Sequence, residues 1–518
     1  MPPATDPSHA LRASLREAGI ELDYPEAVMA EVATWQQSPG IDDASLDDRT
    51  AVPFVTVDGP GTRDLDQALF VEQRDDGFAV QYAIADAAHF VRPGSALLEE
   101  SLRRGASYYL PGEAVPMLPR ALSEDLVSLA PAVDRRAMVF DMRLDATGHC
   151  TNTKIVRARI RSRQQLTFDE VEAVVSGRAQ SRVEDPEIVA SLVAMRAVGQ
   201  RLAELAEARG VVPYHRSEVR VHLDRGVDAR LTAVEVARNF VEADNAQLSL
   251  LCNSEGARIL RDRVDAGAQA QPIYRVHPPP DDDSLAQLEA SVTATARAHG
   301  LDGPWRWDRT RESLAEFVRR LPNDHAHARL VAALSRQAIM INVRSTYAGK
   351  PGPHHGVGTE VYARFSAPMR EVVGVYLHKE MWELLSGEGD EPGRDQVLRQ
   401  RVIEAANRSR ALQSELGRAA DQLVIDALFA GDLAQPVATR PVHRGTLMGM
   451  RRGRVYVRLD DPPLDVKVYI DQLERDYGCD EHGVVLTRAG RTIARLGDPV
   501  AVRVLDRAGN GRWMLDFV

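Results

Sequence analysis

The stretch VDGPGTRDLDQAL, residues 57–69, places three carboxylates in a segment that is otherwise rich in small and apolar residues. Residues 53–57 and 68–71 read as strands, and the glycines and proline between them require a turn. We therefore expect Asp58 at the end of the first strand. We expect Asp64 and Asp66, two residues apart, on one side of the segment that follows.

Crowded carboxylates raise one another's pKa and oppose ionisation, so such a cluster is most stable around a divalent cation. Because only oxygen ligands are at hand, the site favours Mg²⁺, or Mn²⁺, over zinc. Two alternatives stay open. An acid-rich turn can simply be solvated, and Asp64 has the spacing of an aspartyl-phosphate nucleophile, although polar Thr62 and Arg63 precede it. A helix-loop-helix calcium site is excluded because its ligand spacing is missing.

The composition indicates a large globular chain. It has 518 residues, 44% hydrophobic and 27% charged, which suffices for about two to four domains. Neither an apolar run of about 18 residues nor a signal pattern is found, so we expect a cytoplasmic protein without membrane contact. Three scattered cysteines give neither a disulfide framework nor a zinc spacing. The net charge of -11 implies that any nucleic acid is bound by local patches, and we expect a monomer.

We predict an α+β fold with three domains. Residues 1–48 form a small helical unit, for which two interpretations stay open: a packing appendage, which we favour, and a helix-turn-helix that contacts nucleic acid. Residues 49–435 form the main domain, in which strands and amphipathic helices predict a mixed sheet with surrounding helices. A long helical stretch closes this domain, and residues 431–436 read as a linker.

Residues 436–518 read as about five short strands with glycine at the bends, which predicts a closed barrel of the oligonucleotide-binding kind. Arg454 and Tyr456 alternate along one strand, so this strand offers a face for stacking on bases and binding a nucleic-acid backbone. Further arginines near them are Arg451, Arg452 and Arg458.

Three segments of the main domain also suit nucleic acid. Four arginines alternate along residues 155–163, either as a row that binds phosphates or as a solvated face with acidic neighbours. Tyr109, in a proline-rich loop, is placed either to stack on a base or to fill the core. Arg370 follows small residues and a proline at the mouth of a predicted helix, which suits a phosphate or an ion pair.

In their order these motifs resemble the ribonuclease II (RNB) exoribonuclease family with a C-terminal S1 domain, over roughly residues 50–518. The family's acidic signature is similar to Asp58 with residues 64–67, and its IAD strand to residues 84–86. The YLP and PMLP..LS stretch is similar to residues 109–123, and the HFGL and SPIRRY motifs to residues 354–370. The two cold-shock barrels that many members carry in front are not found before the main domain.

The resemblance implies magnesium-dependent, processive 3′-to-5′ hydrolysis of single-stranded RNA to 5′-mononucleotides. It implies Asp58, Asp64 and Asp66 as metal ligands, with Asp64, Asp66 and Arg370 as catalytic residues. Arg370 would bind the scissile or adjacent phosphate, and Tyr109 would pack against the 3′-terminal nucleotide. The other implied substrate contacts are Glu242 (with Gln247 as an alternative), Phe168, Tyr214, Arg454 and Tyr456.

The sequence departs from the family at several of these positions. Gln67 stands where the signature has a further Asp, and Phe168 where a tyrosine that touches ribose is common. Glu371, Val372 and Gly374 replace the usual basic, tyrosine and aspartate residues. Two rival functions follow: an RNA-binding protein of the same fold with weakened or lost catalysis, and a nuclease that acts on DNA.

Overall fold

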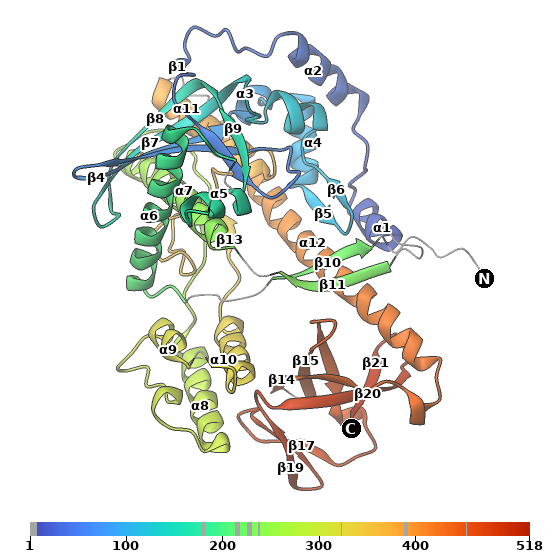
Figure 1. The fold of residues 1–518 in the computed structure, drawn as a ribbon. Coiled ribbons are helices and arrows are strands. Elements are labelled where there is room, and N and C mark those ends of the chain that lie inside the picture. Colours follow the sequence, from blue (N-terminus) through green and yellow to red (C-terminus); the bar gives the residue numbers. More distant parts are fainter. Residues whose placement is uncertain are drawn as a thin grey trace.

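The computed structural model describes residues 8–178, 182–212, 218–224, 230–236, 239–322, 324–387, 392–451 and 453–518. It is an α+β protein, with two N-terminal helices, a large mixed sheet surrounded by helices, and a strand-rich C-terminal part (Figure 1). The predicted fold class is confirmed. Tyr214 and Arg452, for which we predicted RNA contacts, lie outside the described residues.

Seven strands form the main sheet, in the order β1-β8-β7-β4-β3-β2-β9. Most neighbours are antiparallel, but β2 pairs with β9 and β1 pairs with β8 in parallel. The strands expected within residues 53–84 are β2, β3 and β4. Along β2 three buried residues precede Asp58, which is only partly buried. The carboxylate therefore lies where the strand leaves the core. The strands are β1 (Asp47–Arg49), β2 (Val55–Asp58), β3 (Gln67–Arg74), β4 (Gly77–Ala85), β7 (Asp134–Asp145), β8 (Cys150–Arg161) and β9 (Gln164–Thr167).

Helices pack on this sheet around one continuous apolar core. Phe140 of β7 meets Phe365 with 5.7 Å between ring centroids, and Arg157 of β8 lies 4.5 Å from the ring centroid of Trp382 in α11. The first helix of this domain after the sheet, α5, begins with a capping box at Thr167. The helices are α3 (Ala87–Phe90), α4 (Ala96–Arg104), α5 (Phe168–Val175), α6 (Pro186–Ala208), α7 (Phe240–Asp265) and α11 (Val372–Ser386).

The C-terminal part is a five-stranded sheet, in the order β16-β15-β14-β20-β21, with the three-stranded β17-β18-β19 sheet beside it. The edge strands β16 and β21 approach each other, so the large sheet curves, and we call this part the C-terminal barrel. It rests on α8 (Asp282–His299) and α10 (Ala328–Met340), where Arg329 of α10 pairs with Asp460 at 2.8 Å, and α9 (Leu314–Arg320) packs on α10. Its strands are β14 (His443–Arg451), β15 (Arg454–Leu459), β16 (Asp465–Tyr469), β17 (Tyr477–Cys479), β18 (Val485–Arg488), β19 (Arg491–Arg495), β20 (Pro499–Arg507) and β21 (Trp513–Phe517).

Helix α12 (Pro392–Leu433) joins the two parts (Figure 1, orange). Its 42 residues span about 63 Å at the usual rise per residue. We expected a linker from residue 431, but the helix continues to Leu433, because the barrel supports its last turns. Phe429 is fully buried 5.5 Å from Trp513, and an oxygen of Asp432 lies 2.6 Å from Nε2 of His443. The predicted domain boundaries stay predictions.

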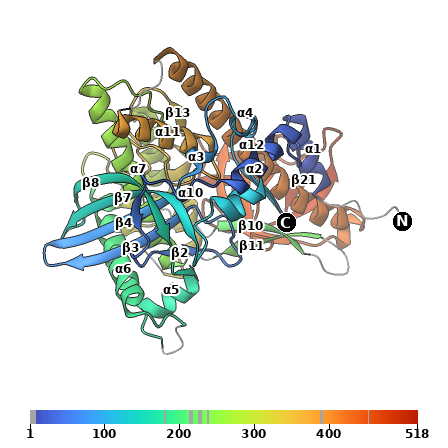
Figure 2. The same ribbon diagram turned by 90° about the horizontal axis from the view of Figure 1, so that it is seen from above.

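The remaining elements are short. Helices α1 (His9–Glu17) and α2 (Glu26–Gln37) lie where the sequence predicts helices, with α1 beside α12 and α2 beside α4 (Figure 2). In the described part of the chain, no helix is both long and apolar enough to cross a membrane. The two-stranded ladders are β5 (Tyr108–Leu110) with β6 (Glu113–Val115), β10 (Glu218–Asp224) with β11 (Arg230–Val236), and β12 (Tyr274–Val276) with β13 (Thr346–Ala348).

Candidate active site

Asp66 lies at the bottom of the site, just before β3, with 2% of its surface exposed. Its Oδ2 accepts a hydrogen bond from Nε of Arg370 at 2.5 Å, and its Oδ1 accepts one from the backbone N–H of Met369 at 3.0 Å. The preceding Leu65 is buried, and its N–H donates to the Ser128 hydroxyl at 3.1 Å. The backbone before β3 is thus anchored, and it aims Asp66 at the segment that carries Arg370.

Asp64 and Asp66 both lie where burial makes ionisation unfavourable. Burial raises the pKa of Asp66 to about 6, although Arg370 and the Met369 N–H oppose the rise. Burial also raises the pKa of Asp64, with Asp58 adding to the rise and Arg370 opposing it. Each carboxylate therefore acts on its neighbour, as the sequence predicted for a crowded cluster. A bound divalent cation would relieve this cost.

Asp58 lies at the end of β2, as expected, and its Oδ1 accepts from the N–H of Gly59 at 2.7 Å. The three aspartates act on one another as neighbouring pairs, Asp58 with Asp64 and Asp64 with Asp66. The three aspartates do not form a compact triad. Among the described residues, the group with three ligand atoms within 4.8 Å of one another is a different one, described below. The all-oxygen donor set fits Mg²⁺ or Mn²⁺, provided that the side chains close around the ion.

Both polar atoms of the Gln67 side-chain amide are engaged in hydrogen bonds within the protein. Its Oε1 accepts a hydrogen bond from the Tyr82 hydroxyl at 2.7 Å, and its amide N–H donates to the backbone carbonyl of Ser366. Its oxygen is therefore engaged in linking β3 to β4, while its nitrogen links β3 to the segment before Arg370. The structure therefore gives Gln67 a structural role.

Asn253, a buried residue of α7 that the sequence analysis does not assign to the site, holds the segment before Arg370 through hydrogen bonds. Its side-chain oxygen accepts from the N–H groups of Phe365 and Ser366, at 2.7 and 3.0 Å. Its amide nitrogen donates to the hydroxyls of Tyr362 and Ser366, both at 2.9 Å. An amide buried within a helix was the available sequence signal, because such a group requires partners.

Glu371 has a partner of its own, which explains how an acid replaces a basic residue beside Arg370. It accepts from Nε of Arg364 at 3.0 Å and from the Tyr347 hydroxyl at 2.7 Å. Burial acts to raise the pKa of Glu371, but Arg364 and Tyr347 outweigh burial and lower it. The carboxylate is therefore ionised and directed away from Arg370.

Tyr109 is the most exposed aromatic residue near these groups, with 62% of its surface accessible. It lies on β5, and its hydroxyl is close enough to Arg370 and Asp64 for their charges to act on it. The backbone places the two residues together, because the N–H of Ser107 donates to the carbonyl of Arg370 at 2.9 Å. The interpretation of Tyr109 as a residue that fills the core is therefore wrong, and its stacking on a base stays a prediction.

Phe168 and Glu242 lie on two segments that contact β2. Thr167 pairs with Asp58 in the parallel β2–β9 ladder, so the half-buried Phe168 follows directly beside it. Glu242 lies one turn before Asn245, whose amide donates to the carbonyl of Val57 at 3.4 Å.

Gln247, the alternative to Glu242, projects elsewhere. It lines a separate cavity of about 380 Å³ between α6, α7 and the turn after β7. The face of α7 that meets the acidic residues therefore favours Glu242.

The four arginines of residues 155–163 are each paired with acidic residues. Arg157 pairs with Asp86 at 3.2 Å and Arg159 with Asp48 at 2.7 Å. Arg161 pairs with Asp134 at 2.6 Å, and Arg163 with Asp185 and Glu187 at 2.8 and 2.9 Å. The interpretation of this face as a row for phosphates is therefore wrong, because its charges are already neutralised.

In the barrel, Arg454 and Tyr456 lie on the outward face of β15, as expected, while Val455 and Val457 are buried. The Arg454 guanidinium lies 5.8 Å from the ring centroid of Tyr469. The Tyr456 ring is half-buried, and Arg336 of α10 lies 5.5 Å from its centroid. Stacking of a base on Tyr456 stays a prediction, and it requires Arg336 to share or leave that ring.

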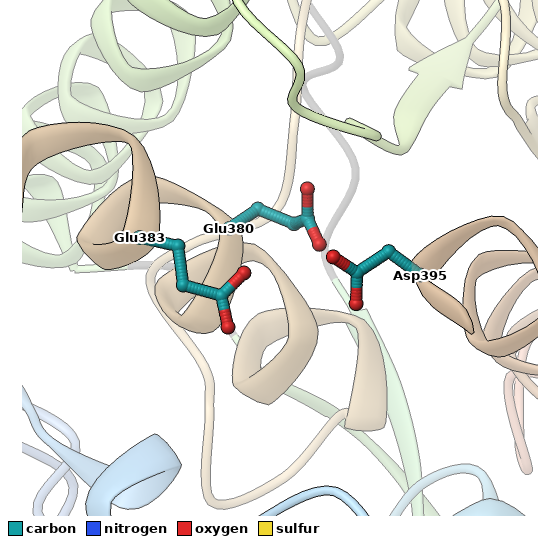
Figure 3. A group of neighbouring side chains, drawn as sticks. All are labelled: Glu380, Glu383 and Asp395. Atoms are coloured by element: carbon teal, nitrogen blue, oxygen red, sulfur yellow. The ribbon is translucent and has the colours of Figure 1, made fainter. Parts of the chain in front are cut away.

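A second carboxylate group was not anticipated from the sequence. Glu380 and Glu383 of α11 face Asp395 near the start of α12 (Figure 3). Nζ of Lys379 already lies among them, 3.1, 2.6 and 2.7 Å from Glu380, Glu383 and Asp395. Burial acts to lower the pKa of Lys379, but the carboxylates outweigh burial and raise it. This ammonium takes the place of a cation, so the group joins two helices rather than binding a metal.

Comparisons with known proteins converge on one family. A family model described as RNB domain matches residues 47–387. Ribonuclease R of Escherichia coli (strain K12) is 28% identical over 96% of this chain, and the chain spans 60% of that relative's length. Mycoplasma genitalium RNase R in complex with ribose methylated single-stranded RNA has a TM-score of 0.86 at 21% identity, covering 99% of this chain and 78% of that one. Yeast Ssd1, a pseudonuclease, has a TM-score of 0.67 at 14% identity, covering 97% and 59%.

Proposed function

Because the chain belongs to the RNB family, we propose that it is an exoribonuclease that degrades single-stranded RNA from its 3′ end, processively, to 5′-mononucleotides. One observation carries the proposal. A buried aspartate with a raised pKa, a cationic side chain and an exposed tyrosine lie together, and they come from three separate parts of the chain. That set provides a metal ligand, a phosphate ligand and a surface for a terminal nucleotide.

We assign Asp58, Asp64 and Asp66 as the residues that would hold Mg²⁺, with Mn²⁺ as a substitute. The bound ion would lower the pKa of a water and offset charge on the phosphate. Arg370 donates from Nε to Asp66, which leaves its Nη groups for a phosphate oxygen. Its raised pKa, to which Asp66 contributes against burial, keeps the guanidinium charged throughout. Arg370 can therefore stabilise the charge that develops on the scissile phosphate.

Tyr109 would pack against the 3′-terminal nucleotide and fix the distance from the chain end to the scissile bond. Phe168 and Glu242 would contact the sugar from the opposite side, and the outward face of the barrel strand β15 would bind the RNA upstream. The cytoplasmic location and the monomeric state stay predictions.

The proposed activity is tested with the wild-type chain on a 5′-labelled single-stranded RNA, with a free 3′ hydroxyl or a 3′ phosphate, and on the matching DNA. We expect the labelled full-length RNA to be converted to a short labelled end product without accumulation of labelled RNAs of intermediate length. Chromatography should identify the released nucleotides as 5′-mononucleotides. Immediate release of the 5′ label as a mononucleotide, or equal degradation of DNA, would contradict the proposal.

One rival is favoured by particular observations: an RNA-binding protein that has lost catalysis. Gln67 replaces a carboxylate and its oxygen is engaged by Tyr82, and the fold is shared with a pseudonuclease. The rival predicts binding of oligo(A) with no release of mononucleotides in either Mg²⁺ or Mn²⁺. We favour the enzyme because the buried aspartate, its arginine and the exposed tyrosine are all present.

A further inference from the structure

The exposed Tyr109 lies on a short hairpin, and α1 with the segment after it covers the opposite face of that hairpin. Along β5 the side chains alternate: Tyr108 and Leu110 are buried, while Tyr109 between them is exposed. The partner strand adds Val115, paired with Tyr108. A two-stranded hairpin has little stability of its own, so the position of Tyr109 depends on what packs beneath it.

Helix α1 supplies that packing. Leu11 and Leu15 are buried and form one apolar cluster with Tyr108, Leu110 and Val115. Helix α12 completes the cluster from the other side with Leu412, Leu416 and Ala420. At the rim, Nε of Arg12 pairs with Glu113 at 2.7 Å, which ties α1 to the second strand of the hairpin.

The segment after α1 clamps the two ends of the hairpin. Arg104, fully buried before β5, donates to the backbone carbonyls of Glu21 and Asp23, both at 2.9 Å, and stacks on the ring of Tyr24 at 4.0 Å. The Tyr24 hydroxyl donates to the carbonyl of Pro116, just after β6, at 2.7 Å. No contact of this N-terminal segment with Asp66 or Arg370 is found among the described residues.

We propose that the segment from Leu11 to Tyr24 is a positioning element that holds Tyr109 at the active site and thereby sets the length of the last RNA product. The inference rests on the proposed function. It assigns no chemistry to the segment, because Asp58, Asp64, Asp66 and Arg370 are held by other parts of the chain. Its effect on product length should therefore pass through Tyr109.

The test is a double-mutant cycle of Leu15→Ala and Tyr109→Ala, with the shortest product from 5′-labelled RNA as the readout. We expect Leu15→Ala to change the product length in the same direction as Tyr109→Ala. It should lower kcat/KM for short RNAs by up to about a hundredfold, as displacements of about 1 Å can. In the Tyr109→Ala background, Leu15→Ala should change neither quantity further. An equal effect of Leu15→Ala in both backgrounds, or wild-type product lengths in the single variant, would overturn the inference.

Two controls separate this outcome from others. Leu288→Ala removes a buried leucine of α8 in a different core cluster, and it should leave product length unchanged. Amide hydrogen exchange of residues 108–115 reports the hairpin without any need for activity. We expect faster exchange there in Leu15→Ala, with β2 and β3 unchanged. Should Leu15→Ala not fold, Glu113→Ala should produce the same change to a smaller extent.

If the wild-type chain released no mononucleotides, the proposed function would fail, and the exchange result would still decide whether α1 holds the hairpin. Unchanged exchange of the hairpin in both Leu15→Ala and Glu113→Ala would overturn the positioning role itself.

Discussion

At the scale of residues, the ion pair between Asp66 and Arg370 joins the two motifs on which the account depends. The two side chains are about 300 positions apart in sequence and meet at 2.5 Å with the carboxylate almost fully buried. Removing one partner of such a pair leaves a buried charge without compensation.

Arg370→Met should therefore destabilise the metal-free protein by about 3 kcal/mol at pH 7.5. The loss should shrink in the Asp66→Asn background, because no buried negative charge then remains. Thermal unfolding of the four members of this cycle measures the coupling. Additive losses would show that the two side chains are not coupled as the structure has them.

Gln67 gives a second prediction at this scale. Gln67→Glu keeps the shape but removes the N–H that donates to the Ser366 carbonyl, and it places two acceptors against each other. We expect a loss of about 1 to 3 kcal/mol in the free energy of unfolding. We expect no increase in Mg²⁺ affinity, because the oxygen that binds Tyr82 stays engaged. A lower Mg²⁺ requirement in the nuclease assay of the variant would contradict this role.

At the scale of elements, the joint between α11 and α12 depends on Lys379. Three carboxylates surround its ammonium group, which lies within 3.1 Å of each. Lys379→Met should lower the unfolding temperature, because the carboxylates then repel one another.

Added Mn²⁺ should restore much of this stability, since the emptied group has three oxygen ligands within 4.8 Å of one another. The measurement is the shift in unfolding temperature with Mn²⁺ in Lys379→Met compared with wild type. Equal shifts in the two proteins would show that the carboxylates do not act as one group.

The elements also show what the sequence could predict. The strands around Asp58 and Asp66, both N-terminal helices and the strand-rich C-terminus follow from apolar spacing and turn residues, which are local properties. The end of α12 could not be predicted in this way. Phe429 and Asp432 are held by contacts with the barrel, and such long-range contacts do not change the local sequence pattern.

The same limit applies to the site. Alternation along β8 correctly placed its arginines on one face, but only the folded chain shows that each meets an acid. That Asp66 and Arg370 belong to one site followed from the resemblance, whereas their direct ion pair required the structure. The partners of Asn253 and the covering of Tyr108 by α1 likewise required the structure, because each depends on segments far apart in the chain.

At the scale of the whole molecule, buried histidines should set the acid limit of stability. Burial lowers the pKa of His378 and His89 to about 4 and that of His354 to about 3. Each is lower than the value of about 6.5 expected in the unfolded chain. Stability from these groups is therefore fully present above pH about 6.5 and is lost as the pH falls from there towards 4.

His354→Leu should weaken this pH dependence at little cost at pH 7.5, because neither ring nitrogen of His354 has a hydrogen-bond partner among the described residues. Urea unfolding of wild type and variant at pH 7.5 and pH 5 measures the difference. Identical loss of stability on acidification in both proteins would contradict the assignment.

The central claim is that the aspartates before β3 perform metal-dependent RNA hydrolysis, and Asp66→Asn tests it most directly. With 5′-labelled single-stranded RNA and Mg²⁺, we expect the rate of nucleotide release to fall at least about a hundredfold, to the level of wild type with a chelator, with RNA binding retained. Asp75→Asn, in the exposed turn between β3 and β4, is the matched control and should keep wild-type activity. Undiminished degradation by Asp66→Asn would contradict the account.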